Sequence, residues 1–392
     1  MAARTAGRNS QLPSRLIHVA FVLTGVMTTL LGPMLPVLSA RWALTDAQAG
    51  YLFTAQFTGS MVGVAISDFV VQRFGYRISL VAGLCAMAAG ATVLAHSPWV
   101  PGLVAVFGYG AGIGLTIPTS NFLIAEWNAH RRAAALNWLN FCWGIGAAAC
   151  PFAVAALVAS HRTPWFLLGV ATALLLLGIA LAVSPGLWPE VPRLQQSGKD
   201  SGVWRDPFVL LLGSLFFLYV GTENSIGGWI ASYTQRIQAA PGARWALAPS
   251  LFWGALLAGR GLAPGFLKLL RERELARLGL LVATCGVTIL LAARSADILL
   301  LAVTVTGLGL SSVFSIYIAL LASRFGKTAP GVRGAMFALG GLGGATLPWL
   351  VGALSTQFGA LKAGLYVPLF GCLTMLALYF LASAGGHSPQ ES

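Results

Sequence analysis

The chain has 392 residues, of which 57% are apolar and only 9% are charged, and its formal net charge is +13. Soluble domains carry about 25% charged residues, so this composition excludes a soluble globular protein. It indicates an integral membrane protein, because mostly apolar segments of 18 or more residues recur along the whole length and each can cross a hydrocarbon core of ~30 Å.

Twelve apolar segments are predicted to span the membrane as helices. They cover residues 16–40, 47–70, 77–96, 99–126, 132–159, 163–184, 207–234, 245–266, 275–293, 297–322, 333–357 and 361–384. The first is too long for a signal peptide and lacks a small-residue cleavage site, so we expect it to be retained.

A long polar stretch with three prolines separates the sixth segment from the seventh. The sequence therefore predicts an all-α integral membrane protein of two pseudo-symmetric six-helix bundles. The expected parts are an N-terminal tail (1–15), a first bundle (16–184), a central loop (185–206), a second bundle (207–384) and a C-terminal tail (385–392).

The positive charge is distributed unevenly between the two sides of the predicted membrane. With the N-terminus in the cytoplasm, 18 of the 24 Lys and Arg residues, Arg260 among them, fall on the cytoplasmic side. This distribution follows the positive-inside rule and puts both termini in the cytoplasm. The charge therefore sets topology and gives no reason to expect nucleic-acid binding. Arg far outnumbers Lys, and Ala and Gly abound, which indicates a GC-rich bacterial genome and hence a bacterial inner membrane.

Glycine and proline motifs recur at matching places in the two halves. GIGLT at 112–116 in the fourth span matches GLGLS at 307–311 in the tenth. The pattern Gly-x-Gly-x4-Pro at 144–151 in the fifth span returns at 341–348 in the eleventh. Small residues let helices approach closely, and repeats on the scale of a half-chain are a transporter design.

Together these features resemble the major facilitator superfamily over essentially the whole chain. The loop after the second span, with Asp68, Arg73, Gly75 and Arg77, is similar to the family's loop motif, although Val64 stands where its first glycine belongs. The phrases AALNWLNFCWGIGA (134–147) and YVGTENSIGGWIASY (219–233) most resemble the fucose–proton symporter family of sugar carriers.

The resemblance implies gating by charged residues at the cytoplasmic ends of the first bundle. The candidates are Asp68, Arg73, Arg77, Glu126, Arg131 and Arg132. For Glu126 we expect a structural ion pair with the neighbouring arginines.

Glu223 is the single acidic residue deep inside a predicted span. A carboxylate at that depth must be paired, protonated or turned to a water-filled cavity, which makes it a functional-site hypothesis. It shares a helical face with Tyr219, precedes Asn224, and is followed by Gly227 and Gly228, which loosen the helix. We expect a role in proton coupling or substrate binding. A permanently protonated acid bonded to another helix is the alternative.

Asn137 and Asn140 share a face of the fifth span, flanked by Phe141 and Trp143. Amides that donate and accept hydrogen bonds, beside an aromatic plane, suit a sugar. Helix–helix hydrogen bonding by the two asparagines is the alternative.

Five further residues are candidates for substrate contact, and three of them have a structural alternative. Gln56 and Asn121 can reach a cavity, Trp253 and Tyr317 can lie against a substrate, and Trp229 can serve as a platform. Helix bonding for Gln56, core packing for Trp253 and interfacial anchoring for Trp229 remain open.

The leading hypothesis is a secondary active transporter of a hexose or related sugar that works as a monomer in the lipid bilayer by alternating access. It would be coupled to a proton through Glu223. The first span carries no acid where fucose-type carriers hold one, so sodium coupling and uniport stay open. The rivals are a carrier of an amphiphile such as a lysolipid or drug, and a non-transporting sugar sensor, although the C-terminal tail is short for a signalling segment.

An enzyme, a cofactor and a metal site are not expected. The spans carry no His-x-x-x-His, Cys-x-x-Cys or Ser/His/Asp arrangement. We interpret the five cysteines as small hydrophobic core residues.

Overall fold

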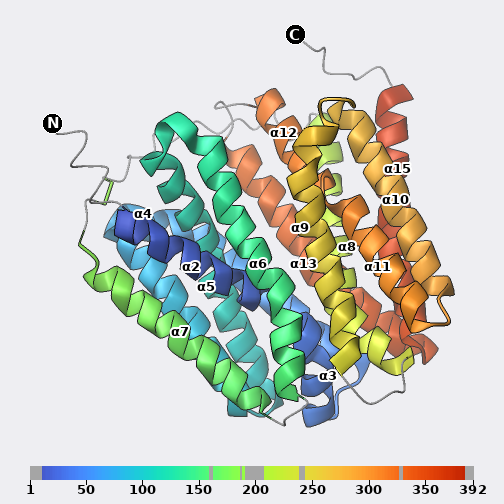
Figure 1. Cartoon of the computed structure of the whole chain (residues 1–392), viewed down its shortest axis with the longest axis horizontal. Coiled ribbons are helices and arrows are strands. Elements are labelled where there is room, and N and C mark those ends of the chain that lie inside the picture. The colour runs from blue at the N-terminus through green and yellow to red at the C-terminus, as the bar shows by residue number, and fades with distance from the viewer. Residues whose placement is uncertain are drawn as a thin grey trace. The chain divides into compact units, whose positions relative to one another are not determined.

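The computed structural model describes residues 11–158, 162–185, 188–189, 207–237, 243–325 and 330–384. In these ranges the regular structure is entirely helical (Figure 1). Ten described helical segments are long and apolar enough to cross a membrane. The all-α prediction is confirmed.

The helices of the first half follow the predicted spans closely. They are α2 (Gln11–Thr29), α3 (Leu31–Trp42), α4 (Asp46–His96), α5 (Trp99–Trp127), η1 (Ala129–Arg131), α6 (Arg132–Val158) and α7 (Thr163–Val183). At 51 residues α4 would be ~77 Å long, so it holds two of the predicted spans. They are separated at Gly75, whose φ of 85° and ψ of 166° are not helical.

The second half has helices at the remaining six predicted spans, although the helix within 245–266 is not among the ten segments that are long and apolar enough to cross a membrane. Its elements are α8 (Pro207–Ile237), η3 (Ala243–Ala246), α9 (Leu247–Phe266), α10 (Glu272–Ala292), α11 (Ala296–Leu310), α12 (Val313–Phe325), α13 (Pro330–Phe358), α14 (Leu361–Gly364) and α15 (Tyr366–Ala384).

Two spans predicted as continuous helices are each broken four residues before a proline. Helix α2 ends at Thr29, four residues before Pro33, and α14 ends at Gly364, four residues before Pro368. A proline ring clashes with the carbonyl of residue i−4 and supplies no N–H group, which explains both breaks. Pro118, inside α5, is tolerated without one.

The chain divides into two compact units that depart from the predicted bundles in one segment. Unit 1 contains Met1–Val37 and Ala55–Leu194, and unit 2 contains Leu38–Thr54 and Gln195–Ser392. The end of α3 and the first turns of α4 therefore group with the helices of the second half.

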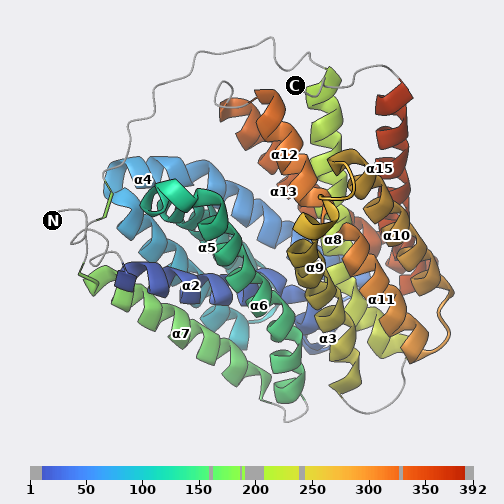
Figure 2. The same cartoon turned by 45° about the horizontal axis from the view of Figure 1, so that its top comes forward.

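The repeated glycines have matching packing roles in the two units. In unit 1 a methyl group at Gly146 of α6 would overlap the carbonyl of Val22 in α2, and in unit 2 one at Gly343 of α13 would overlap the carbonyl of Phe217 in α8. Figures 1 and 2 both show α8 and α13 side by side. The fifth span thus packs on the first as the eleventh packs on the seventh.

Candidate functional site

A buried polar cluster in unit 2 surrounds Glu223. The Tyr219 hydroxyl donates to Glu223 Oε1 at 3.0 Å, and Arg260 Nη2 donates to the same oxygen at 3.3 Å. The Glu223 side chain is 11% exposed and that of Arg260 is 28% exposed. An acid within a span must be paired, protonated or turned to a water-filled cavity, and in the structure Glu223 is paired with Arg260.

The position of Arg260 differs from the one predicted from the distribution of charge. Sequence reasoning counted it with the cytoplasmic basic residues, but it lies within α9 and faces α8 through its contact with Glu223. The available signal was a single basic residue inside the apolar segment 245–266, matched to a single acid inside 207–234. An isolated charge in a span usually has a partner in another helix, and this pair follows that rule.

Aromatic rings hold Tyr219 in place beside the carboxylate. Tyr219 is fully buried, with Phe314 stacked at 5.3 Å between ring centroids and Tyr317 edge-on at 6.0 Å. The Tyr317 hydroxyl lies 3.6 Å from the sulfur of Met375. Tyr317, a predicted substrate contact, is thus fully buried in this aromatic packing.

The other residues of unit 2 that were predicted to contact the substrate differ in how deeply they are buried. Trp229 is 1% exposed and donates its indole N–H to the carbonyl of Pro348 at 2.8 Å. Trp253 is 4% exposed and lies where a methyl group on Gly227 would collide with its ring. Asn224 is partly exposed and donates to Val220 of its own helix at 2.8 Å.

In unit 1, Gln56 uses both ends of its amide within the protein. Its nitrogen donates to the Thr28 carbonyl at 2.9 Å, and its oxygen accepts from the Tyr109 hydroxyl at 2.9 Å. Trp143 donates its indole N–H to the Thr28 hydroxyl at 3.3 Å. Gln56 therefore bonds helices together, which was the structural alternative at this position.

The fifth-span face is open in the structure of unit 1. Asn137 and Asn140 are exposed, and Asn140 donates to Leu136 of its own helix at 2.8 Å. Trp138 and Phe141 stack beside them at 5.5 Å. On α5, Asn121 is partly exposed and donates to Ile117 at 2.8 Å.

Among the predicted gating residues of unit 1, Arg77 and Glu126 bond to residues distant in the sequence. The Arg77 guanidinium donates to the carbonyl of Ser184 at 2.9 Å and lies over the Trp188 ring at 5.0 Å. Glu126 accepts from the Tyr76 hydroxyl at 3.0 Å.

The ion pair expected between Glu126 and the neighbouring arginines is wrong: among the described residues Asp46 pairs with Arg236 and Glu223 with Arg260, and Glu126 belongs to neither pair. Arg131 and Arg132 are exposed, and the Arg132 side chain bonds instead to the carbonyl of Ala125 at 3.4 Å. The exposed side chains of Asp68 and Arg73 likewise belong to neither pair.

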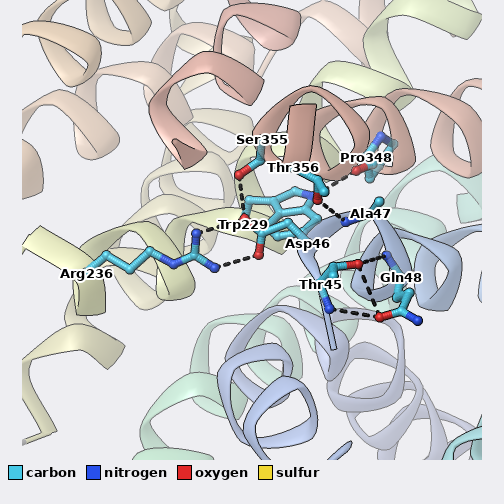
Figure 3. A network of polar contacts seen from close by, with 9 residues as sticks. All are labelled: Thr45, Asp46, Ala47, Gln48, Trp229, Arg236, Pro348, Ser355 and Thr356. Atoms are coloured by element: carbon cyan, nitrogen blue, oxygen red, sulfur yellow. Dashed lines mark hydrogen bonds and ion pairs between the residues drawn. The ribbon is translucent and has the colours of Figure 1, made fainter. Parts of the chain in front are cut away.

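A second polar cluster, absent from the sequence predictions, surrounds Asp46 in unit 2 (Figure 3). The Arg236 guanidinium donates to the Asp46 carboxylate through two nitrogens, at 2.6 and 2.8 Å, and the Ser355 hydroxyl donates to the same carboxylate. Beside it the Thr356 hydroxyl accepts from the Ala47 backbone N–H at 2.8 Å. We call these five residues the Asp46 network. Sequence reasoning missed it because Asp46 lies between predicted spans, where an acid is ordinary.

Unit 2 also contains an apolar cavity of about 540 Å³ between α8, α13 and α15. Its walls include Leu210, Phe217, Met336 and Leu378, with the hydroxyl-bearing Ser214 among them. The described residues hold no group of three or more His, Cys, Asp or Glu that could bind a metal.

The sequence profile of the Major Facilitator Superfamily matches residues 17–337. The chain belongs to this family of membrane transporters, so it is a secondary transporter rather than an enzyme. Its fold is that of the family, as likeness to solved transporters also shows. The bacterial homologue of the human lysosomal transporter Spinster matches with a TM-score of 0.79 at 14% identity, covering 97% of this chain and 98% of that one. The E. coli fucose:proton symporter matches with a TM-score of 0.65 at 16% identity, over 95% and 99% of the two chains.

Two relatives match along most of their length. The sodium-dependent glucose transporter 1A of Mus musculus is 23% identical over 94% of this chain and 96% of its own length. A glucose/galactose transporter of Brucella abortus is 22% identical over 93% of this chain and 92% of its own.

Proposed function

We propose that this transporter carries a hexose or a related sugar. The observation that carries the proposal is that relatives named for glucose transport are similar over more than nine tenths of the chain. The exposed face of α6 supports it, since Asn137 and Asn140 offer amides beside the stacked rings of Trp138 and Phe141. Amides and an aromatic plane match the hydroxyls and the apolar face of a sugar.

The proposed coupling site is Glu223 together with Arg260. The Arg260 guanidinium lies 3.3 Å from the Glu223 carboxylate, and separation of the two would leave a charge inside the membrane without its partner, a cost that proton uptake by the carboxylate would remove. Differential proton affinity between two conformations is what couples an ion to a transport cycle. Sodium coupling, which the mouse relative's name mentions, and uniport are the competing mechanisms.

The proposed cycle is alternating access by a monomer in a bacterial inner membrane, with both termini cytoplasmic. The bias of basic residues towards one side supports that orientation, and it persists without Arg260. In this cycle Asp68, Arg73, Arg77, Glu126, Arg131 and Arg132 act at the cytoplasmic gate. We propose that Asn121 of unit 1 and Asn224 of unit 2 each contact the sugar. The other predicted contacts, Gln56, Trp229, Trp253 and Tyr317, support this role through packing and hydrogen bonds within their own units.

Sugar-driven proton movement tests the coupling. Glucose added to proteoliposomes should carry protons inward and raise the external pH. Glu223→Gln should abolish this signal while leaving exchange of labelled for unlabelled glucose. Asp297→Asn, a change at an exposed acid in the first turn of α11, is the matched control and should behave as the parent. A pH signal that survives Glu223→Gln contradicts the assignment.

The apolar cavity between α8, α13 and α15 favours a second candidate, a carrier of an amphiphile. Its volume of about 540 Å³ lies in the range of small-molecule sites, and apolar side chains dominate its walls. In that case lysophosphatidylcholine should raise the thermal unfolding midpoint more than glucose does. Ser214→Phe, which fills the cavity, should cancel the increase. Stabilisation by glucose alone would favour the sugar.

A further inference from the structure

We propose that the end of α9 and its connection to α10 form a binding surface for anionic phospholipids, with leucines in the lipid and two basic residues at the phosphates. The surface comprises residues 262–271 of unit 2, which we call the α9 tip. Figure 1 shows it at the upper ends of α9 and α10. The proposal goes beyond the proposed function, because it depends neither on the sugar nor on the coupling ion nor on the orientation of the chain.

The α9 tip exposes four large apolar side chains within eight residues. They are Leu262 at 58%, Phe266 at 49%, Leu267 at 40% and Leu269 at 83% exposure. The backbone around them is equally open, since methyl groups on Gly261 and Gly265 would meet no atom within 4 Å. Single apolar side chains at a surface are ordinary, but a group of them marks a place where something else binds.

The leucines of the tip are exposed by an ordered turn. The backbone N–H groups of Leu269 and Leu270 both donate to the carbonyl of Phe266, each at 2.9 Å. The Arg271 N–H then donates to the Glu274 side chain at 3.1 Å as α10 begins. Because these bonds fix the backbone, the leucines are held outward by the fold itself.

The membrane is the surrounding that this turn meets. Helix α10 begins at Glu272 and is one of the ten described segments that are long and apolar enough to cross a membrane. The tip directly precedes α10, so it lies where the chain enters the bilayer. At that level apolar side chains reach the acyl chains, and basic side chains lie among the headgroups. Leucines that would be unfavourable in water are therefore favourable here.

The charge of the tip selects the kind of lipid. Residues 262–271 contain two basic residues, Lys268 and Arg271, and no acid, and both basic side chains are exposed. The acids that follow, Glu272 and Glu274, belong to the first turn of α10, where the helix dipole stabilises them. Basic side chains at a membrane surface attract anionic lipids, so phosphatidylglycerol should be preferred to a zwitterionic lipid.

A photoreactive side chain at position 269 identifies what the tip contacts. p-Benzoylphenylalanine replaces Leu269, and the protein is reconstituted in vesicles of equal parts phosphatidylglycerol and phosphatidylcholine. After illumination, mass spectrometry of the peptide that contains position 269 separates the two lipid adducts. The phosphatidylglycerol adduct should exceed the phosphatidylcholine adduct at least about fivefold, the factor that corresponds to ~1 kcal/mol for one basic residue.

Three pairs of substitutions in this background test the role of charge. Lys268→Gln with Arg271→Gln should bring the two adducts to about equal amounts. Arg294→Gln with Lys362→Gln removes two exposed basic residues elsewhere in unit 2 and should leave the preference unchanged. Lys268→Arg with Arg271→Lys keeps both charges and should also preserve it. Because all these side chains are exposed, each variant should keep the unfolding midpoint of the parent.

Four results would overturn the proposal. Equal lipid adducts in the parent would mean that the tip inserts without selecting a headgroup. Adducts with a second copy of the chain, or with another part of the same chain, would mean that protein covers the surface, and absence of any adduct would place it in water. A preference that excess inorganic phosphate abolishes would assign the basic pair to free phosphate. The assay uses neither sugar nor ion gradient, so its failure is distinct from failure of the transport assignment.

Discussion

At the scale of single residues, the pairing of Glu223 with Arg260 is the interaction on which the buried chemistry of unit 2 depends. Glu223 lies in α8, which is long and apolar enough to cross a membrane, and Arg260 lies in the neighbouring helix α9; an unpaired charge inside a membrane costs several kcal/mol. Replacing both members of a buried ion pair is often nearly neutral, whereas removing one leaves the other uncompensated.

A double-substitution cycle tests this coupling. Arg260→Gln should lower the free energy of unfolding by ~1–3 kcal/mol, because Glu223 loses a donor. Glu223→Gln should destabilise similarly, and the double variant should be more stable than the sum of the two changes predicts. Thermal unfolding midpoints in detergent supply the measurement. Strictly additive effects would mean that the two residues do not act as a pair.

The hydrogen bonds of the Gln56 side chain should contribute to the stability of the protein. Gln56→Leu leaves the Tyr109 hydroxyl and the Thr28 carbonyl without their partner and should cost ~1–3 kcal/mol of stability. Asn140→Leu is the control, because Asn140 is exposed and bonds to its own helix, and should change stability by less than ~0.5 kcal/mol. A neutral Gln56→Leu would contradict helix bonding and favour direct contact with substrate.

The sequence identifies residues that are unusual for their position, but it does not identify the residues that they contact. The isolation of Glu223 in an apolar span is visible from the order of residues alone, and so is the need for a partner. Which residue fulfils that need depends on how α9 is rotated against α8, which no spacing along one helix determines. The same limit applies to Glu126, where neighbouring arginines in sequence favoured an ion pair and the structure has a tyrosine from α4 instead.

At the scale of helices, the break inside α4 depends on one backbone conformation. Gly75 has φ 85° and ψ 166°, a region open essentially to glycine alone. This glycine separates two predicted spans whose exact ends the apolar pattern alone does not determine.

Gly75→Ala should therefore destabilise the protein by ~1–3 kcal/mol, although no atom obstructs the added methyl group. Gly169→Ala, at an equally open site within helix α7, should stabilise it by ~0.5–1 kcal/mol, because alanine favours helix. Equal effects at the two sites, measured by thermal unfolding, would show that the conformation of Gly75 is not a constraint.

Helix positions were well predicted because membrane length and apolarity constrain them strongly. The breaks at Thr29 and Gly364 were not predicted, although both follow the proline rule. Pro118 and Pro151 lie inside unbroken helices, so neighbouring packing decides which prolines interrupt a helix. That packing is a property of the folded unit.

At the scale of the whole molecule, the repeated glycine motifs correctly indicated a duplicated arrangement. Gly146 and Gly343 make equivalent close approaches in their own units, as their matching positions in the two halves predict. The segment Leu38–Thr54 could not be assigned in this way, because its grouping with unit 2 depends on contacts far apart in sequence, such as that of Asp46 with Arg236.

Counterflow in proteoliposomes can show whether the protein transports a hexose. Vesicles are loaded with unlabelled glucose, and entry of labelled glucose is followed without an ion gradient, so that coupling does not affect the result. A hexose carrier should accumulate the label transiently, and an excess of other hexoses should abolish the accumulation by competition. Absence of accumulation across a panel of hexoses, in vesicles that contain folded protein, would contradict the sugar assignment and favour an amphiphile as cargo.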